Sequence, residues 1–314
     1  MKKFLIFALA LLCLCIPLSA DAHKKATKGK PRTTATQSKQ KRSSKRAFMV
    51  GISVYRAHGR DSWGNIHGAE DVAMLKPVLA QQGFDITTLV DEEATYSNIK
   101  KSLNQFINNT RTGDIVYLHF STHGQPVEDG LNGLGKDEAD GWDESIVPID
   151  AASRYGHNGY QGDKHLTDDE LTVYFERLRN QIGPTGVLYV AMDACHAGGA
   201  SRGIELNTVR GTNEGLSRSG AIFDPRSGDT AKHYNLKADK QLAPTLFLEA
   251  CTARQRNSEI RINGKECGSL SYNIKCALEK RPLSKDTSCF KNDVIESTQQ
   301  AGHWPNRQSL VIEE

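Results

Sequence analysis

Two apolar segments of this sequence each lead into a side chain that can take part in nucleophilic chemistry. The first, residues 115–124, ends in His123 and Gly124, and the second, residues 187–199, carries Cys195 shortly before two glycines. Catalytic groups collect where parallel strands end at one edge of a sheet. A cysteine attacks as the thiolate, and a nearby imidazole lowers its pKa and carries the proton. We therefore predict Cys195 as a nucleophile and His123 as its general base.

Glycines beside both residues allow the backbone to come close to a bound ligand. A tetrahedral intermediate carries a negative oxygen that backbone N–H groups can stabilise. We expect the N–H groups of Gly124 and Cys195 to be these donors. The predicted chemistry is therefore acyl transfer through a covalent thioester.

The two motifs, Ser121 to Gly124 and Asp193 to Gly199, resemble those of the caspase–hemoglobinase clan of cysteine peptidases. Within that clan the sequence is most similar to metacaspases and bacterial metacaspase-like (orthocaspase) proteins, from residue 46 to residue 314. The resemblance implies a caspase-like α/β/α sandwich that cleaves peptides through a covalent acyl-enzyme. The QAC motif of animal caspases is absent, and DACH, residues 193–196, takes its place.

The resemblance also implies a specificity pocket. Metacaspases line their S1 pocket with an Asp, a Ser and an Asp at the places of Asp71, Ser121 and Asp193. Two carboxylates in a partly dry pocket favour Arg or Lys before the scissile bond. Two other readings stay open. One is a catalytically weak caspase-fold module that binds basic peptides, and the other is a clostripain- or gingipain-like Arg-specific peptidase.

A calcium site is a further implication of the resemblance. Calcium-dependent metacaspases take ligands from the residues that match Asp143, Asp168 and Asp169, and such oxygen ligands suit Ca²⁺. A fourth ligand of those relatives falls here on Arg202, a cation in place of a carboxylate. The Cys–His chemistry itself requires no cofactor. An alternative role for Asp168 and Asp169 is to stabilise a helix N-terminus through the helix dipole.

Alternating strand and helix patterns after residue 46 predict an α/β fold. β-branched and apolar runs predict strands at residues 47–54, 84–90, 115–123, 187–195 and 244–250. Helical spacing of apolar residues predicts helices at 68–82, 96–109, 166–178 and 269–279, the third opened by a capping box from Thr167 to Glu170. Short strands are expected at 146–149 and 309–312. Strands joined by helices imply a mostly parallel central sheet with helices on both faces.

Residues 203–243 form a long polar loop with little periodicity, and a loop of this length is usually functional or disordered. Beside an Arg/Lys-selective pocket, its basic residues and Arg202 are candidate sites of self-cleavage. These residues are Arg202, Arg210, Arg218, Arg226, Lys232 and Lys237. The alternative is that they only keep the loop soluble.

The first 46 residues differ from the rest in composition. Residues 1–22 carry Lys2 and Lys3 before an apolar run and are predicted to be a signal peptide, so we expect export to the periplasm or the medium. Residues 23–46 hold ten Lys or Arg and no acidic residue, which is typical of a disordered tail or pro-segment. Such a segment could also tether the protein to an anionic surface or nucleic acid. No later stretch is apolar and long enough to cross a membrane.

Residues 47–314 are predicted to form one peptidase domain. The formal charge of the chain is +3, of which residues 1–22 contribute +1 and residues 23–46 contribute +10, so this part carries −8. We expect no nucleic-acid binding by the folded part, a monomer, and partners that are peptide or protein substrates.

Five cysteines remain after residue 22. Setting Cys195 aside, one or two disulfides are expected among Cys251, Cys267, Cys276 and Cys289, with three possible connectivities. The alternative is that these four pack as buried free thiols.

Overall fold

The computed structural model describes residues 44–56, 62–134, 138–195, 208–212, 214–224, 234, 236–252 and 255–314. The predicted signal peptide, most of the basic tail, Arg202 and several basic residues of the long loop lie outside these ranges. Within them, no helix is both long enough and apolar enough to cross a bilayer.

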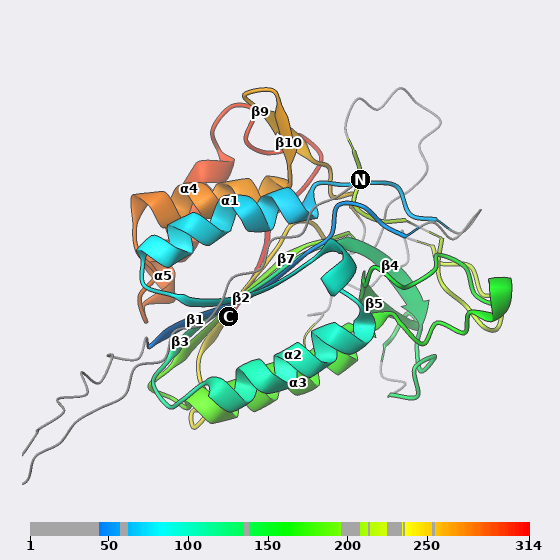
Figure 1. Ribbon diagram of the computed structural model, residues 1–314, viewed down its shortest axis with the longest axis horizontal. Coiled ribbons are helices and arrows are strands. Elements are labelled where there is room, and N and C mark those ends of the chain that lie inside the picture. The colour runs from blue at the N-terminus through cyan, green and yellow to red at the C-terminus, as the bar shows by residue number, and fades with distance from the viewer. Residues whose placement is uncertain are drawn as a thin grey trace, which may run out of the picture. The chain divides into compact units, whose positions relative to one another are not determined.

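A six-stranded sheet forms the centre of the fold (Figure 1), in the order β11-β8-β7-β3-β1-β2. All neighbouring pairs run parallel except β11, which is antiparallel to β8. Every residue of β3 and β7 is buried, as expected for strands covered on both faces. The bounds are β1 Lys45–Gly51, β2 Asp85–Val90, β3 Ile115–Ser121, β7 Val187–Asp193, β8 Thr245–Glu249 and β11 Val311–Glu313.

Helices cover both faces of this sheet (Figure 1). On one face lie α1 (Gly68–Gln81), α4 (Ser269–Lys280) and α5 (Thr287–Thr298), and on the other lie α2 (Tyr96–Asn109) and α3 (Asp168–Ile182). Two short 3₁₀ turns, η2 (Asp91–Glu93) and η3 (His157–Gly159), lie in the connections. Each face has its own hydrophobic cluster. The predicted α/β/α sandwich with a mostly parallel sheet is therefore confirmed.

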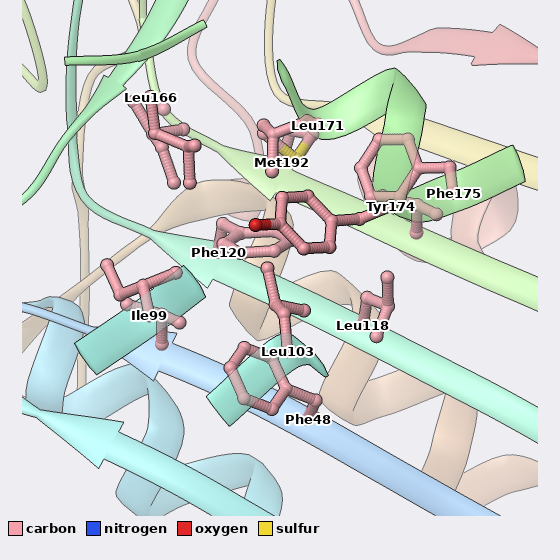
Figure 2. Close-up of a cluster of buried hydrophobic side chains, with 14 of the residues drawn as sticks. Phe48, Ile99, Leu103, Leu118, Phe120, Leu166, Leu171, Tyr174, Phe175 and Met192 are labelled. Atoms are coloured by element: carbon pink, nitrogen blue, oxygen red, sulfur yellow. The ribbon is translucent and has the colours of Figure 1, made fainter. Parts of the chain in front are cut away.

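Buried apolar side chains pack α2 and α3 against one face of the sheet (Figure 2). Phe48 of β1 packs against Phe120 of β3, with ring centroids 6.4 Å apart. Leu103 of α2 lies beside them, and Phe175 of α3 packs against Phe247 of β8; both side chains are fully buried. The apolar faces predicted for these helices are thus the faces that contact the sheet.

The segment before His123 is not one strand, as the sequence predicted, but two. β3 ends at Ser121, and β4 (His123–Glu128) begins a separate antiparallel sheet with β5 (Trp142–Val147) and β6 (Leu166–Thr167). The pairing of β4 with β5 satisfies backbone groups that would otherwise be left at the sheet edge. The predicted strand to Cys195 likewise ends at Asp193.

The helix predicted from residue 166 begins two residues later. Leu166 and Thr167 pair with β5, and Thr167 is the N-cap, whose side chain accepts a hydrogen bond from the Glu170 N–H at 3.4 Å. The predicted capping residue is therefore correct, but the predicted bounds are not, because the helix starts two residues later than predicted and continues four residues further, to Ile182.

One helix and one β-hairpin near the C-terminus were not predicted. The helix α5 buries only two large apolar side chains, Phe290 and Val294, so its periodicity is weak. The hairpin of β9 (Ile260–Ile262) and β10 (Lys265–Cys267) turns at Asn263 and Gly264, a pair typical of two-residue hairpin turns.

All five described cysteines are free, so the disulfides predicted among the last four are not formed. Of the four late cysteines, Cys251 follows β8, and Cys267, Cys276 and Cys289 lie on β10, α4 and α5. Cys267 contacts the Ile260 carbonyl, and Cys289 contacts a carboxylate oxygen of Asp286. The alternative of packed thiols describes them better.

Substitution on α3 tests this packing. Phe175 is fully buried and meets Tyr234 and Phe247 edge-on, so Phe175→Ala is expected to lower the free energy of unfolding by about 3–5 kcal/mol. Val173 on the same helix is 52% exposed, and Val173→Ala is expected to change it by less than about 0.5 kcal/mol. Urea unfolding followed by circular dichroism measures both. Equal decreases in the free energy of unfolding for the two variants would contradict the orientation of α3.

Candidate active site

The parallel pairing of β3 with β7 places the two predicted catalytic segments at the same edge of the sheet. In this register Ser121 lies opposite Asp193, and the two chains continue for two residues to His123 and to Cys195. A Cβ atom built on Gly211 would touch backbone carbonyl oxygens on both segments. The segments therefore meet around one point of the structure.

The imidazole of His123 is buried and held in one orientation. Its Nε2 donates a hydrogen bond to the Gly64 carbonyl oxygen at 2.8 Å, and its ring stacks on Trp63 with centroids 5.0 Å apart. The His123 backbone N–H donates to the Tyr55 hydroxyl at 2.8 Å. Nδ1 then carries the lone pair, and it has no hydrogen-bond partner in the described part of the chain. Burial lowers the pKa of His123 to about 4, so the ring is neutral and can accept a proton.

The thiol of Cys195 is buried beside the end of β8. It donates a hydrogen bond to the Gln255 carbonyl oxygen at 3.0 Å. It also hydrogen-bonds with the Cys251 thiol, and this contact raises the pKa of Cys251 well above its usual value. The Cys195 thiol is therefore directed at the Gln255 carbonyl oxygen, while His123 Nδ1 receives no hydrogen bond from the described residues.

The three residues predicted to line the S1 pocket lie together and are fully buried. Asp71 of α1 accepts a hydrogen bond from the Ser121 hydroxyl at 2.7 Å. The N-terminus of α4 faces both carboxylates: the Gly268 N–H donates to Asp71 at 3.0 Å, and the Ser271 N–H donates to Asp193 at 2.8 Å. A Cβ on Gly268 would lie 2.1 Å from an Asp193 oxygen, so glycine is needed for this approach. The helix dipole adds to the stabilisation of both charges.

The guanidinium of Arg210 fills this pocket. Its Nη2 donates to Asp71 at 2.7 Å, its Nη1 donates to the Ser121 hydroxyl, and Nη1 lies 3.5 Å from the Asp193 carboxylate. Arg210 is completely buried, although it comes from the polar segment in which the sequence predicted no element. The pocket thus holds a basic side chain of its own chain.

A third carboxylate, which the sequence analysis did not identify, completes the pocket. Glu259 Oε1 accepts hydrogen bonds from Arg210 Nε at 3.0 Å and from Nη2 at 2.8 Å. His67 holds Glu259 from the other side, through its backbone N–H at 2.8 Å and its Nδ1 at 2.6 Å. Residues 251–258 carry no strand or helix pattern, so no signal in the sequence placed Glu259.

Three buried carboxylates share one guanidinium in this pocket. Burial raises the pKa of Asp71 to about 6, against the effect of Arg210. Burial acts in the same direction on Asp193, but Arg210 and the hydrogen bonds from Asn257 and Ser271 lower its pKa below the usual value. Burial opposes the charge of Arg210, yet the carboxylates raise its pKa. The pocket therefore has an excess of negative charge that favours a bound cation.

The chain before Arg210 pairs with residues 257–259 as a short antiparallel strand. The Arg210 N–H donates to the Asn257 carbonyl at 2.9 Å, and the Thr208 carbonyl accepts from the Glu259 N–H at 2.9 Å. Val209 forms the bridge opposite Ser258. This is how a peptide bound by strand addition would present its residues to the pocket.

The chain after Arg210 pairs with β4. The Leu216 N–H donates to the Pro126 carbonyl at 2.8 Å, and the Leu216 carbonyl accepts from the Glu128 N–H at 2.9 Å. The carboxylate of Glu128 accepts three more hydrogen bonds from residues 217–219. The Arg210–Gly211 peptide bond lies between the two paired segments, beside the segments of His123 and Cys195.

The sequence was compared with models of known protein families. Residues 45–202 match the family model described as metacaspase, peptidase C14 domain. The chain belongs to the metacaspase family of caspase-like peptidases. The match includes His123, Cys195, Asp71 and Asp193, and it ends before Arg210.

Individual relatives of this metacaspase are distant. It is 24% identical over 288 residues to Metacaspase-1 of Lodderomyces elongisporus, covering 79% of this chain and 61% of that protein. It is 23% identical over 287 residues to Metacaspase-1 of Candida albicans, with the same two shares. The chain thus spans less than two thirds of the length of these curated relatives. A crystal structure of protein GSU0716 from Geobacter sulfurreducens has the same fold, with a TM-score of 0.56, 20% identity, and 86% and 92% of the two chains covered.

The three carboxylates predicted to bind Ca²⁺ lie near one another in this metacaspase. Both oxygens of Asp143 on β5 and one oxygen of Asp168 are buried without a hydrogen-bond partner among the described residues. Burial, and then repulsion from neighbours that include Asp129 and Asp169, raise the pKa of Asp143 to about 8. Burial and Glu144 raise the pKa of Asp168 as well. An oxygen-only donor set, in which the buried oxygens of Asp143 and Asp168 have no hydrogen-bond donor among the described residues, fits a hard divalent cation.

A second group of side chains that could bind a metal ion takes part in other hydrogen bonds. His67, Glu259 and Glu266 each offer an atom within 4.8 Å of the others. Glu259, however, already accepts hydrogen bonds from Arg210 and His67. This group is therefore part of the hydrogen-bond network around Arg210.

Proposed function

We propose that this metacaspase is a cysteine endopeptidase that cleaves after Arg or Lys, with Cys195 as nucleophile and His123 as general base. The observation that carries the proposal is the Arg210 side chain, which contacts Asp71, Ser121 and Glu259 in the S1 pocket. A pocket that binds the chain's own arginine in this way is suited to bind that of a substrate. The family match favours this reading over a clostripain- or gingipain-like peptidase.

The proposed chemistry begins when the Cys195 thiol transfers its proton to His123 Nδ1 and the sulfur attacks the carbonyl carbon of the P1 residue. The N–H groups of Gly124 and Cys195 then stabilise the oxyanion. His123 returns the proton to the leaving amine, and the C–N bond breaks to give a thioester. Water, deprotonated by His123, hydrolyses the thioester and restores the thiol.

We further propose that the uncut chain is a zymogen. Arg210 fills the pocket that a substrate would need, so another peptide cannot bind there at the same time. The pairing of residues 208–210 and of Leu216 on either side supports the Arg210–Gly211 bond as the site of self-cleavage. Once this bond is cut, the two new ends can leave the pocket and open it.

Ca²⁺ is the cation that we propose for the carboxylates of Asp143, Asp168 and Asp169. It would supply the positive charge that no described side chain gives to the buried oxygens of Asp143 and Asp168. Asp143 lies on β5, which pairs with the strand that begins at His123. Relief of repulsion at Asp143 would therefore stabilise the sheet that carries the general base.

Export stays a prediction from residues 1–22, which lie outside the described residues. We also propose that the substrates are proteins and that the peptidase is a monomer. A mature protein that begins at His23 would support export, and one that keeps Met1 in an exporting host would contradict it.

Peptide cleavage tests the pocket and the nucleophile. Internally quenched peptides that copy residues 208–212, with Arg, Lys or Asp in place of Arg210, are expected to be cut only after Arg and Lys. Cys195→Ala is expected to lower kcat by about 10³-fold or more, because it removes the attacking sulfur. Cleavage of the Asp peptide alone would overthrow the pocket, and an active Cys195→Ala variant would overthrow the nucleophile.

The same panel includes a matched pair of carboxylate variants. Because Glu259 accepts from the Nε–H that lysine lacks, Glu259→Gln is expected to lower kcat/KM by about 10–100-fold for the Arg peptide and by less for the Lys peptide. Glu266, which also lies near His67 but does not contact Arg210, provides the control Glu266→Gln.

Self-cleavage is tested on the full chain. On incubation, wild type is expected to yield a fragment that begins at Gly211, identified by N-terminal sequencing. Arg210→Gln is expected to abolish this fragment, because the amide cannot neutralise the pocket carboxylates. Arg218→Gln alters an exposed residue of the same segment and should leave the fragment unchanged. A Gly211 fragment from the Cys195→Ala variant would point to a contaminating protease.

Thermal unfolding tests the calcium site without relying on activity. In the Cys195→Ala background, which prevents processing, Ca²⁺ at about 100 times its Kd is expected to raise Tm by about 5–10 °C. Asp143→Asn is expected to remove this gain, and to raise Tm in chelator because it removes a buried repulsion. Asp163→Asn, at an exposed site, is the control. Equal Tm values in Ca²⁺ and in chelator would reject the site.

A further inference from the structure

Gly211, the residue after Arg210, occupies a space in which only glycine fits. Its φ is +148°, a conformation that other residues rarely adopt. A Cβ atom on Gly211 would lie 2.0 Å from the Cys195 carbonyl oxygen and 2.9 Å from the Gly124 carbonyl oxygen. Both are backbone atoms, so no side-chain rotation can relieve the clash. A residue with a Cβ therefore requires the backbone of the site itself to move.

The backbone on both sides of Gly211 is held by contacts that oppose such a movement. The carbonyl oxygen of Ala194, next to Cys195, accepts from the Asn257 side chain at 3.4 Å and from the Cys251 thiol at 3.8 Å. On the other side, Gly124 belongs to β4 and pairs with Ile146 of β5. Shifting either segment would disturb the sheet or the pocket that it borders.

The place of Gly211 in the reaction follows from that of Arg210. Since Arg210 occupies the S1 pocket, Gly211 is the P1′ residue, and its nitrogen belongs to the leaving amine. The bridges of Val209 with Ser258 and of Leu216 with Val127 hold the chain on both sides of this bond. The limit on side-chain size at residue 211 is therefore a limit on the residue that follows the scissile bond.

We propose that the P1′ subsite admits glycine alone, so that this metacaspase cleaves bonds between a basic residue and glycine. The inference rests on the proposed peptidase function and narrows its substrates to peptides and proteins with accessible Arg–Gly or Lys–Gly sequences. Its physical basis is the backbone wall formed by the carbonyl groups of Cys195 and Gly124.

The proposal also selects among the candidate self-cleavage sites. Glycine follows only three basic residues in the chain, which are Lys28, Arg202 and Arg210. Serine, serine, histidine and alanine follow the other four candidates, which are Arg218, Arg226, Lys232 and Lys237. Self-cleavage should therefore produce N-termini at Gly29, Gly203 or Gly211 and at no other basic site.

Peptides that differ only in the P1′ residue test the proposal. Quenched peptides with the sequence of residues 206–213 carry Gly, Ala, Ser or Leu at the place of Gly211. We expect kcat/KM for the Ala and Ser peptides to be about 10–100-fold below that for the Gly peptide, and lower still for Leu. Comparable values for the four peptides would overturn the proposal.

A peptidyl-arginine methyl ester separates this proposal from the proposed function, because its leaving group is methanol and it has no P1′ residue. Ester hydrolysis with equal cleavage of all four peptides rejects the glycine requirement and keeps the peptidase. Absence of ester and peptide hydrolysis rejects both. In the self-digest of the wild-type chain, an N-terminus at Ser219, Ser227, His233 or Ala238 would also contradict the glycine requirement.

Discussion

One guanidinium inside the protein compensates the buried carboxylates of the predicted S1 pocket. Arg210 contacts Asp71 and Glu259 directly and lies 3.5 Å from Asp193, and all four side chains are buried. Buried carboxylates without a cation would repel one another at close range in a medium of low dielectric constant. The pocket is therefore more stable when it holds a cation, whether from the chain or from a substrate.

This constraint links stability to function. In the function that we propose, the contacts that would bind a substrate arginine are the contacts that hold residues 208–210 in place, so the uncut chain would be folded and closed at the same time. Gly268 lets the N-terminus of α4 reach the carboxylates of Asp71 and Asp193 and adds fixed N–H donors to them. These donors lower the cost of the negative charge without neutralising it, and a bound cation is still favoured.

The second acidic group of the molecule provides a contrast. Around Asp143 and Asp168 no described side chain plays the part that Arg210 plays in the pocket, and the buried oxygens of both residues lack hydrogen-bond partners among the described residues. The pKa of Asp143 is raised to about 8, whereas in the pocket that of Asp193 is lowered. Arg210 and the hydrogen bonds from Asn257 and Ser271 lower the pKa of Asp193, whereas burial still raises the pKa of Asp71 to about 6 although Arg210 contacts it. Both groups border strands that lead to the segments of His123 and Cys195, so charge compensation at either would affect the same candidate site.

The sequence alone determined the elements with strong periodicity and the segments at their ends. The apolar runs before Ser121 and Asp193 predicted two parallel strands, and their common register brings the segments of His123 and Cys195 together as expected. The prediction that one strand continues to His123 was wrong, because that residue pairs with β5 in a second sheet.

The tertiary structure alone decided which charges share the pocket. Arg210 and Glu259 come from segments without helix or strand periodicity, and neither has a local pattern that predicts burial. Their positions depend on backbone pairing between segments distant in sequence and on the attraction of opposite charges in a buried space. The same reason explains Gly211: its sequence context is ordinary, and only the two carbonyl groups packed against it show why no larger residue fits.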